Sequence, residues 1–351
     1  MLAGWGAARK LPGSLNAYKI LQSATVRKLI LIIPLIFLLR SSFGQDPQFT
    51  QFYANPLYLA PSFAGAIESD RVTASYRNQW ASLPGAYVTY SFSYDHFFEP
   101  FNSGVGILLL RDVSGTGDLA LTNAGVQYSY DIKINNSWHV RPGIHVNYTQ
   151  MGIDYFKLTW NDQITASGSG GGTIEQPGEN MKADVDVSTS ALVYSDRYWG
   201  GFAVDHLLRP NYGLWNNQLD WPMKFTVFGG AQIVKRGRLF NPIDESLSLA
   251  FMFRHQGLYN QLDLGVYWYK APLMLGIWYR GIPLIGMDPR GDAVAFLVGY
   301  KMDDIRVGYS YDFTMSNLVS STGGSHEISV SYQFSTTRKR KKKRMVPCPE
   351  F

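Results

Sequence analysis

The sequence predicts an all-β fold, a transmembrane β-barrel of the outer-membrane type with about 14 antiparallel strands. Its main support is a period-two alternation of polar and apolar residues, which puts one set on each face of a strand. From Trp138 to Thr149, every second residue is apolar or aromatic, and the residues between them are polar or glycine. Outer-membrane barrels show this pattern because alternate side chains face the lipid and the lumen.

A large soluble β-sandwich would show the same alternation, but the aromatic content favours the membrane barrel. Aromatic residues make up 15% of the chain. Several lie at the ends of predicted strands, namely Trp80, Trp138, Trp199, Trp221 and Tyr300. An aromatic girdle at the two membrane interfaces would place them there.

Residues 1–44 are predicted to be a signal peptide. Arg27 and Lys28 precede an apolar run over residues 29–39, and Ser42-Phe43-Gly44, with small residues at its first and third positions, provides a cleavage site before Gln45. The alternative, a membrane anchor, is disfavoured because a spanning helix needs about 20 residues. Residues 1–25 are unusual ahead of a signal peptide, so we hypothesise that translation starts near Val26.

Residues 45–70 are predicted to form a separate periplasmic or plug-like segment, packed in or under the barrel. Its three prolines, Pro47, Pro56 and Pro61, are expected to prevent regular secondary structure. A flexible linker is the alternative, but the aromatic and leucine residues of the segment argue against free solvation.

The barrel itself is predicted over residues 71–335. The expected strands are 71–80, 86–97, 103–112, 118–132, 137–149, 183–194, 199–207, 223–234, 246–255, 260–269, 273–281, 293–300, 305–313 and 326–335. We number the connections between successive strands along the chain. The even-numbered ones are mostly short, with 235–245 as the exception, and the odd-numbered ones include the longest, 150–182 and 208–222. Bacterial barrels have short turns in the periplasm and long loops outside. Fourteen strands then put both termini in the periplasm.

Charge is concentrated at the predicted periplasmic tail, residues 336–351. The chain has a formal net charge of +5, yet residues 45–337 hold 19 basic and 26 acidic residues. The tail contains seven consecutive basic residues, Arg338, Lys339, Arg340, Lys341, Lys342, Lys343 and Arg344. Such a block is typical of a disordered interaction tail. Its expected partners are membrane lipid head groups or an acidic periplasmic protein. The alternative is a topological lock, in which the charges only keep the C-terminus from crossing the membrane. Export argues against nucleic acid.

The sequence shows no constellation for catalysis, cofactor binding or metal binding. The glycines at 168–172 lack the Lys-Ser/Thr ending of a phosphate loop, and His326-Glu327 has no second histidine four residues on. The single cysteine, Cys348, cannot form an intramolecular disulfide. We therefore predict a binding protein, without enzyme activity or cofactor. The aromatic residues of the long loops are its candidate contacts with a partner, namely Trp160, Tyr212 and Trp215.

The predicted mature N-terminus carries the most specific motif, QDPQFTQFYANPLYLAPSFAG over residues 45–65. Its distinguishing residues are Asp46, Pro47, Gln48, Phe49, Gln51, Tyr53, Asn55, Pro56 and Leu57. YRNQW at 76–80 and GSHEIS at 324–329 are two further motifs. Together they closely resemble the PorP/SprF family of type IX secretion system membrane proteins. One departure is Ala60, where the family often has Asn.

This resemblance implies an outer-membrane barrel that assists secretion and surface attachment of cargo proteins through their C-terminal sorting domains. The cargo of such proteins is often a giant adhesin of gliding motility. Other secretion components, a periplasmic ring or a peptidoglycan-binding protein, are implied partners. Two alternatives remain: a general porin or small-solute channel, which requires an open lumen, and an outer-membrane enzyme of the lipase or protease kind.

Overall fold

The computed structural model describes residues 45–67, 69–165, 168–169, 172–175, 178–214, 219–238, 241–282, 292–315 and 322–334. The predicted signal peptide, Trp215 and the basic tail from Arg338 to Arg344 lie outside these ranges. No helix within them is long and apolar enough to cross a membrane.

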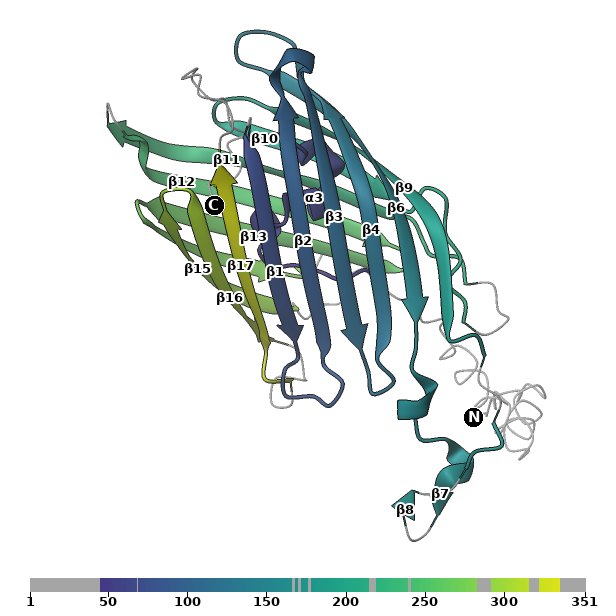
Figure 1. Ribbon diagram of the computed structural model, residues 1–351. Coiled ribbons are helices and arrows are strands. Elements are labelled where there is room, and N and C mark those ends of the chain that lie inside the picture. Colours follow the sequence, from purple (N-terminus) through teal and green to yellow (C-terminus); the bar gives the residue numbers. More distant parts are fainter. Residues whose placement is uncertain are drawn as a thin grey trace, which may run out of the picture. The chain divides into compact units, whose positions relative to one another are not determined.

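Within the described residues, fourteen long antiparallel strands close into one barrel (Figure 1). They are β1 (Asp70–Gln79), β2 (Tyr87–Phe98), β3 (Ser103–Ser114), β4 (Leu119–Tyr130), β6 (His139–Gly152), β9 (Met181–Tyr194), β10 (Tyr198–Asp205), β11 (Lys224–Arg238), β12 (Asn241–Gln256), β13 (Tyr259–Lys270), β14 (Leu273–Arg280), β15 (Ala293–Met302), β16 (Ile305–Thr314) and β17 (Ser325–Phe334). Each strand lies within a few residues of its predicted position. The predicted fold is confirmed.

Three two-residue strands complete the β-structure. β5 (Ile132–Lys133) pairs with the start of β6, whereas β7 (Ile164–Thr165) and β8 (Gly168–Ser169) form a small hairpin in the longest connection. The ring closes because β4 pairs with β6 and β1 pairs with β17. A closed sheet leaves no unpaired edge, which a bilayer requires because lipid cannot hydrogen-bond to the backbone.

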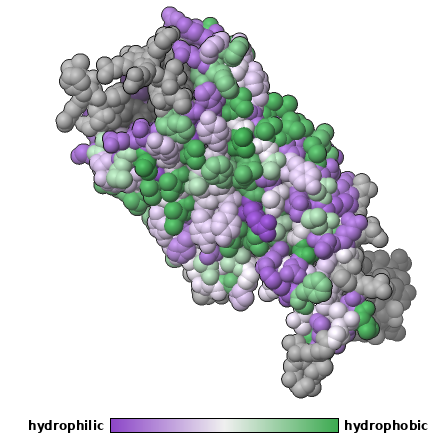
Figure 2. Space-filling model, viewed as in Figure 1, coloured by the Kyte–Doolittle hydropathy of each residue, from purple (hydrophilic) through white to green (hydrophobic). Residues whose placement is uncertain are grey.

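The predicted alternation maps onto the two faces of the barrel wall. On β6, Ile144 and Val146 are exposed on the outside, whereas His145 and Asn147 are buried on the inside. On β17, Ile328 is exposed and Glu327 is buried in the same way. Figure 2 shows apolar side chains gathered over the outer wall. This face meets lipid, and the inner face meets the lumen.

The two ends of the barrel differ in their connections. At the short-turn end, β9 and β10, β13 and β14, and β15 and β16 are joined by two or three residues each. The long-loop end carries the connections 153–180, 206–223 and 281–292. The predicted long connection over 235–245 is wrong, because β11 extends to Arg238 and β12 starts at Asn241. Arg236 pairs there with Glu245, so the hairpin continues beyond a bulge near Gln232.

Residues 45–67 lie inside the barrel, where Figure 1 shows α3 behind the front strands. The segment forms three short turns, η1 (Phe52–Ala54), α3 (Pro56–Leu59) and η2 (Pro61–Phe63). The expectation that its prolines prevent regular structure is therefore wrong. Pro56 and Pro61 each occupy the first positions of a helical turn, where proline loses no hydrogen bond and has the required φ.

The lumen is not uniformly polar, as the alternation alone would suggest. Side chains from β1, β2, β16 and β17 give it a polar half, with Arg77, Asp95 and Glu327 buried there. The opposite half is apolar. Its buried side chains include Leu192, Trp199, Phe228, Met252, Tyr267, Met274, Trp278 and Leu297. The N-terminal segment packs against this apolar half.

Candidate functional site

The N-terminal segment fills the lumen, and the side chains around it are buried. Gln51, Leu57 and Ala64 of the segment are at most 1% exposed. So are Ser310 and Glu327 of the wall that surrounds it. Eight strands suffice for side chains to fill a barrel interior, whereas 16–18 leave an aqueous channel. In this 14-stranded barrel, residues 45–67 occupy the space that would otherwise hold water.

Near the short-turn end, the segment rests directly on the backbone of the wall. The Ala64 carbonyl accepts hydrogen bonds from Ser129 Oγ and Arg141 Nη2, both at 2.7 Å. A Cβ built on Gly104 would lie 1.9 Å from that carbonyl oxygen, and one on Gly143 would lie 2.3 Å from Ser62 N. Only glycine leaves room for the segment at these two wall positions.

In the middle of the barrel, aromatic rings join the segment to the apolar half of the wall. Phe52 meets Trp278 edge-on at 5.0 Å between ring centroids, and Tyr53 meets Tyr267 at 5.2 Å. Trp199 packs 6.2 Å from Phe52 and is 4% exposed. Its predicted place in an interfacial girdle is therefore wrong, because its side chain points inward and packs against the segment.

Towards the long-loop end, four buried charged residues of the wall hold Thr50 of the segment, and we call these five residues the Arg77 cluster. It comprises Thr50, Arg77, Arg280, Asp312 and Glu327. Arg77 donates to Thr50 Oγ1 at 2.6 Å, to Asp312 Oδ2 at 2.7 Å and to Glu327 Oε2 at 3.0 Å. Arg280 donates to the same Asp312 oxygen at 2.7 Å. Each buried charge thus has an opposite partner, as burial demands.

The two motif glutamines lie against this cluster. Gln51 donates to the Glu327 carbonyl at 3.0 Å and accepts from Ser329 Oγ at 2.6 Å. Gln48 accepts from Arg280 Nη2 at 2.8 Å. Backbone N–H groups of Thr50 and Gln51 donate to the two Glu327 oxygens at 2.7 and 3.0 Å. The cluster therefore binds both backbone and side chains of the segment.

The remaining motif residues shape the segment itself. Phe49 packs edge-on against Tyr58, 5.2 Å away, and the Pro47 carbonyl accepts from the Tyr58 hydroxyl. Asn55 precedes α3, which begins at Pro56. The Leu57 carbonyl accepts from Gln127 of the wall at 2.8 Å. All nine motif residues thus belong to the segment inside the lumen.

Asp46 lies at the long-loop end, opposite to Asp70. Its carboxylate accepts from Lys224 Nζ at 2.7 Å and Trp221 Nε1 at 2.8 Å, and it contacts His206 Nε2 at 2.9 Å. Phe334, by contrast, pairs with Asp70 at the short-turn end. Asp46 and Phe334 therefore lie at opposite ends of the barrel, because residues 45–70 traverse the lumen.

His206 is held in its charged form by this arrangement. Burial disfavours the charge, but the carboxylates of Asp46 and Asp186 outweigh burial and raise the pKa of His206 to about 10. Its Nδ1 lies 2.7 Å from Asp186 Oδ2. His206 therefore forms two ion pairs at neutral pH, one to the segment and one to β9. Because the folded-state pKa is the higher one, their contribution is lost only as pH rises through about 10.

The loop residues predicted as partner contacts have different environments. Tyr212 is 1% exposed and packs 5.5 Å from Trp221, so it supports its loop from beneath and is not available as a surface contact. Trp160 is partly exposed, with its ring 6.1 Å from Tyr155. Its neighbour in the loop, Phe156, is fully exposed and is not among the contacts predicted from the sequence.

The residues of the Arg77 cluster are also absent from the predicted sites. Arg77 and Glu327 lie in two of the motifs that carry the family resemblance, at positions where the alternation turns them inward. A charged residue at an inward position is the signal that could have found them. Across the described ranges, no group of three or more His, Cys, Asp or Glu side chains is placed to hold a metal ion. The geometry supports binding of the protein's own segment.

Comparison with known proteins gives one strong match and several distant ones. A family model described as type IX secretion system membrane protein PorP/SprF matches residues 41–332. No curated protein matches the chain. Similar solved structures include the toluene transporter TodX of P. putida, at 11% identity and TM-score 0.43, covering 79% of this chain and 93% of that one. A KdgM porin has 10% identity and TM-score 0.35, with coverages of 75% and 99%.

Proposed function

Because this chain belongs to the PorP/SprF family of type IX secretion system membrane proteins, we propose that it is a closed outer-membrane anchor for secreted cargo. The observation that carries the proposal is the filled lumen. A general porin needs an open water path, whereas residues 45–67 occupy the interior. Because residues 45–67 fill the interior of the described barrel, interaction with partners at its two ends is the role that the geometry supports best.

The long-loop end is the proposed cargo-binding face, exposed to the outside. Its longest connection carries three large apolar side chains in contact with solvent, Phe156, Ile164 and Ile174, at 100%, 60% and 88% exposure. Trp160 lies between the first two in the sequence. We take these exposed apolar side chains as the candidate contacts, since exposed apolar patches on proteins mark interaction sites. The proposed occupant is the C-terminal sorting domain of an adhesin-like cargo, as in gliding motility.

The short-turn end is then the periplasmic end. In this proposal, signal peptidase cleaves before Gln45, and residues 45–67 enter the barrel so that Asp46 lies at the outer end. Residues 336–351 follow β17 into the periplasm, where Arg338 to Arg344 would bind other components of the secretion system. Lipid head groups of the inner leaflet are the competing partner for these charges.

Replacing Phe156, Trp160 and Ile174 together by Ser tests the cargo-binding face. We expect surface display of the cargo to fall at least about tenfold, since large apolar contacts at interface centres are often worth more than 1 kcal/mol each. Quantitative proteomics of shaved surface proteins, compared with a gene deletion, gives the measurement. Leu258→Ser is the control, because Leu258 is also exposed, at 61%, in another turn of the same end.

Normal cargo display by the triple variant would contradict the assignment of this face. Normal display in the deletion strain, together with reduced uptake of small solutes, would favour the porin instead. Heat-dependent gel mobility of each variant confirms that the barrel is assembled.

Replacing the seven basic residues from Arg338 to Arg344 by Gln tests the periplasmic tail. We expect a normally assembled barrel that no longer co-purifies with periplasmic secretion components, because seven adjacent positive charges require an anionic partner. High salt should reproduce the loss with the unchanged protein, since ions screen exposed charges. Normal co-purification and normal cargo display would leave the tail as a topological lock only.

A further inference from the structure

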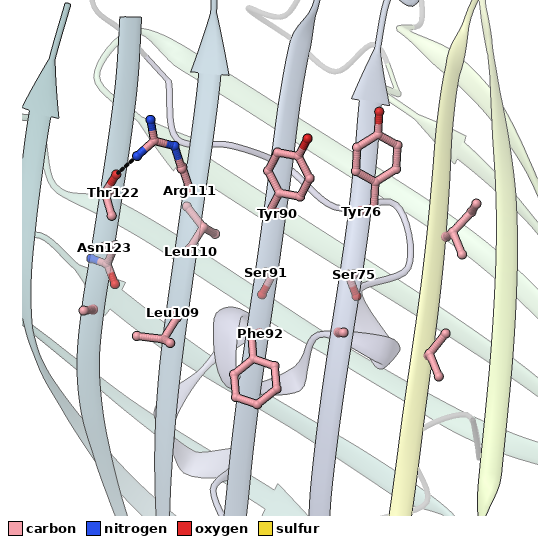
Figure 3. Close-up of a pocket in the computed structure, with 14 residues that line it drawn as sticks. Ser75, Tyr76, Tyr90, Ser91, Phe92, Leu109, Leu110, Arg111, Thr122 and Asn123 are labelled. Atoms are coloured by element: carbon pink, nitrogen blue, oxygen red, sulfur yellow. Dashed lines mark hydrogen bonds between the residues drawn. The ribbon is translucent and has the colours of Figure 1, made fainter. Parts of the chain in front are cut away.

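The outer wall of the barrel contains a trough that runs over β17, β1, β2, β3 and β4 (Figure 3). Its volume is about 550 Å³, within the range of sites that hold a small ligand. The exposed side chains that line it belong to the lipid-facing set of these strands, and include Ala74, Tyr76, Tyr90, Phe92, Leu109, Arg111, Ala124, Ile328 and Val330. The trough therefore opens towards the membrane.

Small side chains between large ones make the wall hollow here. Ala74 is opposite Phe92 in the pairing of β1 with β2, and Ala124 is opposite Leu109 in the pairing of β3 with β4. An alanine in a row of large apolar residues leaves a depression in the outer surface. Phe92 and Leu109 (Figure 3) project from β2 and β3, the two strands that lie between β1, which carries Ala74, and β4, which carries Ala124. The depression has the apolar lining that an acyl chain requires.

One end of the trough carries polar groups in a single row across the sheet. Tyr76 is paired with Tyr90, Tyr90 with Arg111, and Arg111 with Thr122. Figure 3 shows the two phenol groups and the guanidinium pointing towards the same end of the trough. The rings of Tyr76 and Tyr90 are 5.3 Å apart. This row can offer hydroxyl and guanidinium donors to one head group.

Arg111 is the single charged residue among the fourteen that line the trough. Its Nη1 donates a long hydrogen bond of 3.4 Å to Thr122 Oγ1, and none of those fourteen residues carries a carboxylate. Asp112, the next residue, is on the inward side and accepts from Thr89. A cation facing lipid costs about 2–4 kcal/mol at the bilayer midplane and less near the interface. A charge-assisted hydrogen bond to an anion beside it would offset part of that cost.

The position of Arg111 along the strand matches a lipid head group. It is three residues from the end of β3 at Ser114, which is about 10 Å along the strand. The apolar part of the trough extends from there towards the short-turn end. We propose that the trough binds one phosphate-bearing membrane lipid, with its phosphate on Arg111 and the tyrosine hydroxyls and one acyl chain over Ala74. This inference rests on the barrel wall and is independent of the cargo proposal.

Native mass spectrometry of the delipidated, full-length protein tests this site. Titration with phosphatidylglycerol should show one bound lipid at concentrations where phosphatidylcholine, which has no net charge, does not bind. Arg111→Gln should weaken phosphatidylglycerol binding at least about tenfold, because it removes the charge. Ala74→Leu should do the same by filling the trough while it leaves Arg111 in place.

Two matched controls should bind the lipid as the unchanged protein does. Arg236→Gln removes an exposed arginine at the opposite end, and Ala183→Leu enlarges an exposed alanine on β9. Equal binding of both lipids, or binding that neither trough substitution weakens, would overturn the proposal. A change of oligomeric mass in the two trough variants, with lipid binding unchanged, would assign the trough to a second protein chain and would also overturn it.

Discussion

Deletion of residues 46–67 is expected to convert the closed barrel into an ion-conducting pore. The segment fills a lumen that 14 strands make too wide for wall side chains to close alone. Without it, the charged residues of the polar half would line a water-filled path. The measurement is single-channel conductance in planar bilayers. The complete protein should show little or none, and the deletion variant should show stable, large openings.

The deletion could also prevent assembly, because the apolar half of the lumen loses the surface against which it packs. Gly104→Ala and Gly143→Ala therefore provide a second route. Each adds one methyl group, which would lie 1.9 Å from the Ala64 carbonyl oxygen or 2.3 Å from Ser62 N. The seated segment must move, and we expect partial conductance and faster proteolysis of residues 45–67.

Gly152→Ala is the matched control for these variants. A Cβ at Gly152 would be 3.4 Å from its nearest neighbour, an ordinary contact, and we expect no conductance. If the deletion variant and both wall variants assemble into barrels that stay closed, the segment is not what closes the lumen. The proposal of a closed anchor would then lose its main support.

The barrel wall could be predicted from the sequence because its pattern is local. Alternation between lipid and lumen is set by neighbouring residues in one strand, so Ile144 and His145 identify their own faces. Strand ends are also close to prediction, since turns interrupt the alternation. The one connection predicted wrongly, 235–245, contains charged residues, and such a composition is typical of a loop. In the structure, Arg236 and Glu245 face each other across a continuing hairpin.

The interior could not be predicted because its contacts join residues that are far apart in the sequence. Thr50 and Glu327 are 277 residues apart, and no periodicity relates them. Trp199 and Trp138 both lie at the start of a predicted strand, yet of the two only Trp199 meets an aromatic ring of the segment and turns inward. In the sequence, Tyr212 is indistinguishable from an exposed loop residue, because its burial depends on the loop folding over Trp221. The motif predicted a packed segment but not its path through the barrel.

Arg77→Leu is expected to destabilise the protein strongly. Arg77 is 2% exposed and contacts Thr50, Asp312 and Glu327 at once. Asp312 would keep Arg280 as a partner, but Glu327 would lose its cation and remain buried. Removing one partner of a buried ion pair costs about 3–5 kcal/mol. The midpoint temperature of the heat-modifiable gel shift should fall clearly.

The same replacement at Arg236 is the control, because its salt bridge with Glu245 is largely exposed and such pairs contribute little.

The double variant Arg77→Leu, Glu327→Leu distinguishes two causes of the destabilisation, the loss of the contacts of Arg77 and the unpaired charge that remains on Glu327. If the unpaired Glu327 carboxylate is the main cost, the double variant should recover much of the stability, since replacing both partners by apolar residues is often neutral. Conductance distinguishes local detachment of the segment from unfolding of the whole barrel. An assembled Arg77→Leu barrel should open transiently as residues 46–51 detach. If Arg77→Leu leaves the midpoint temperature of the gel shift unchanged and shows no channel conductance, the cluster does not hold the segment.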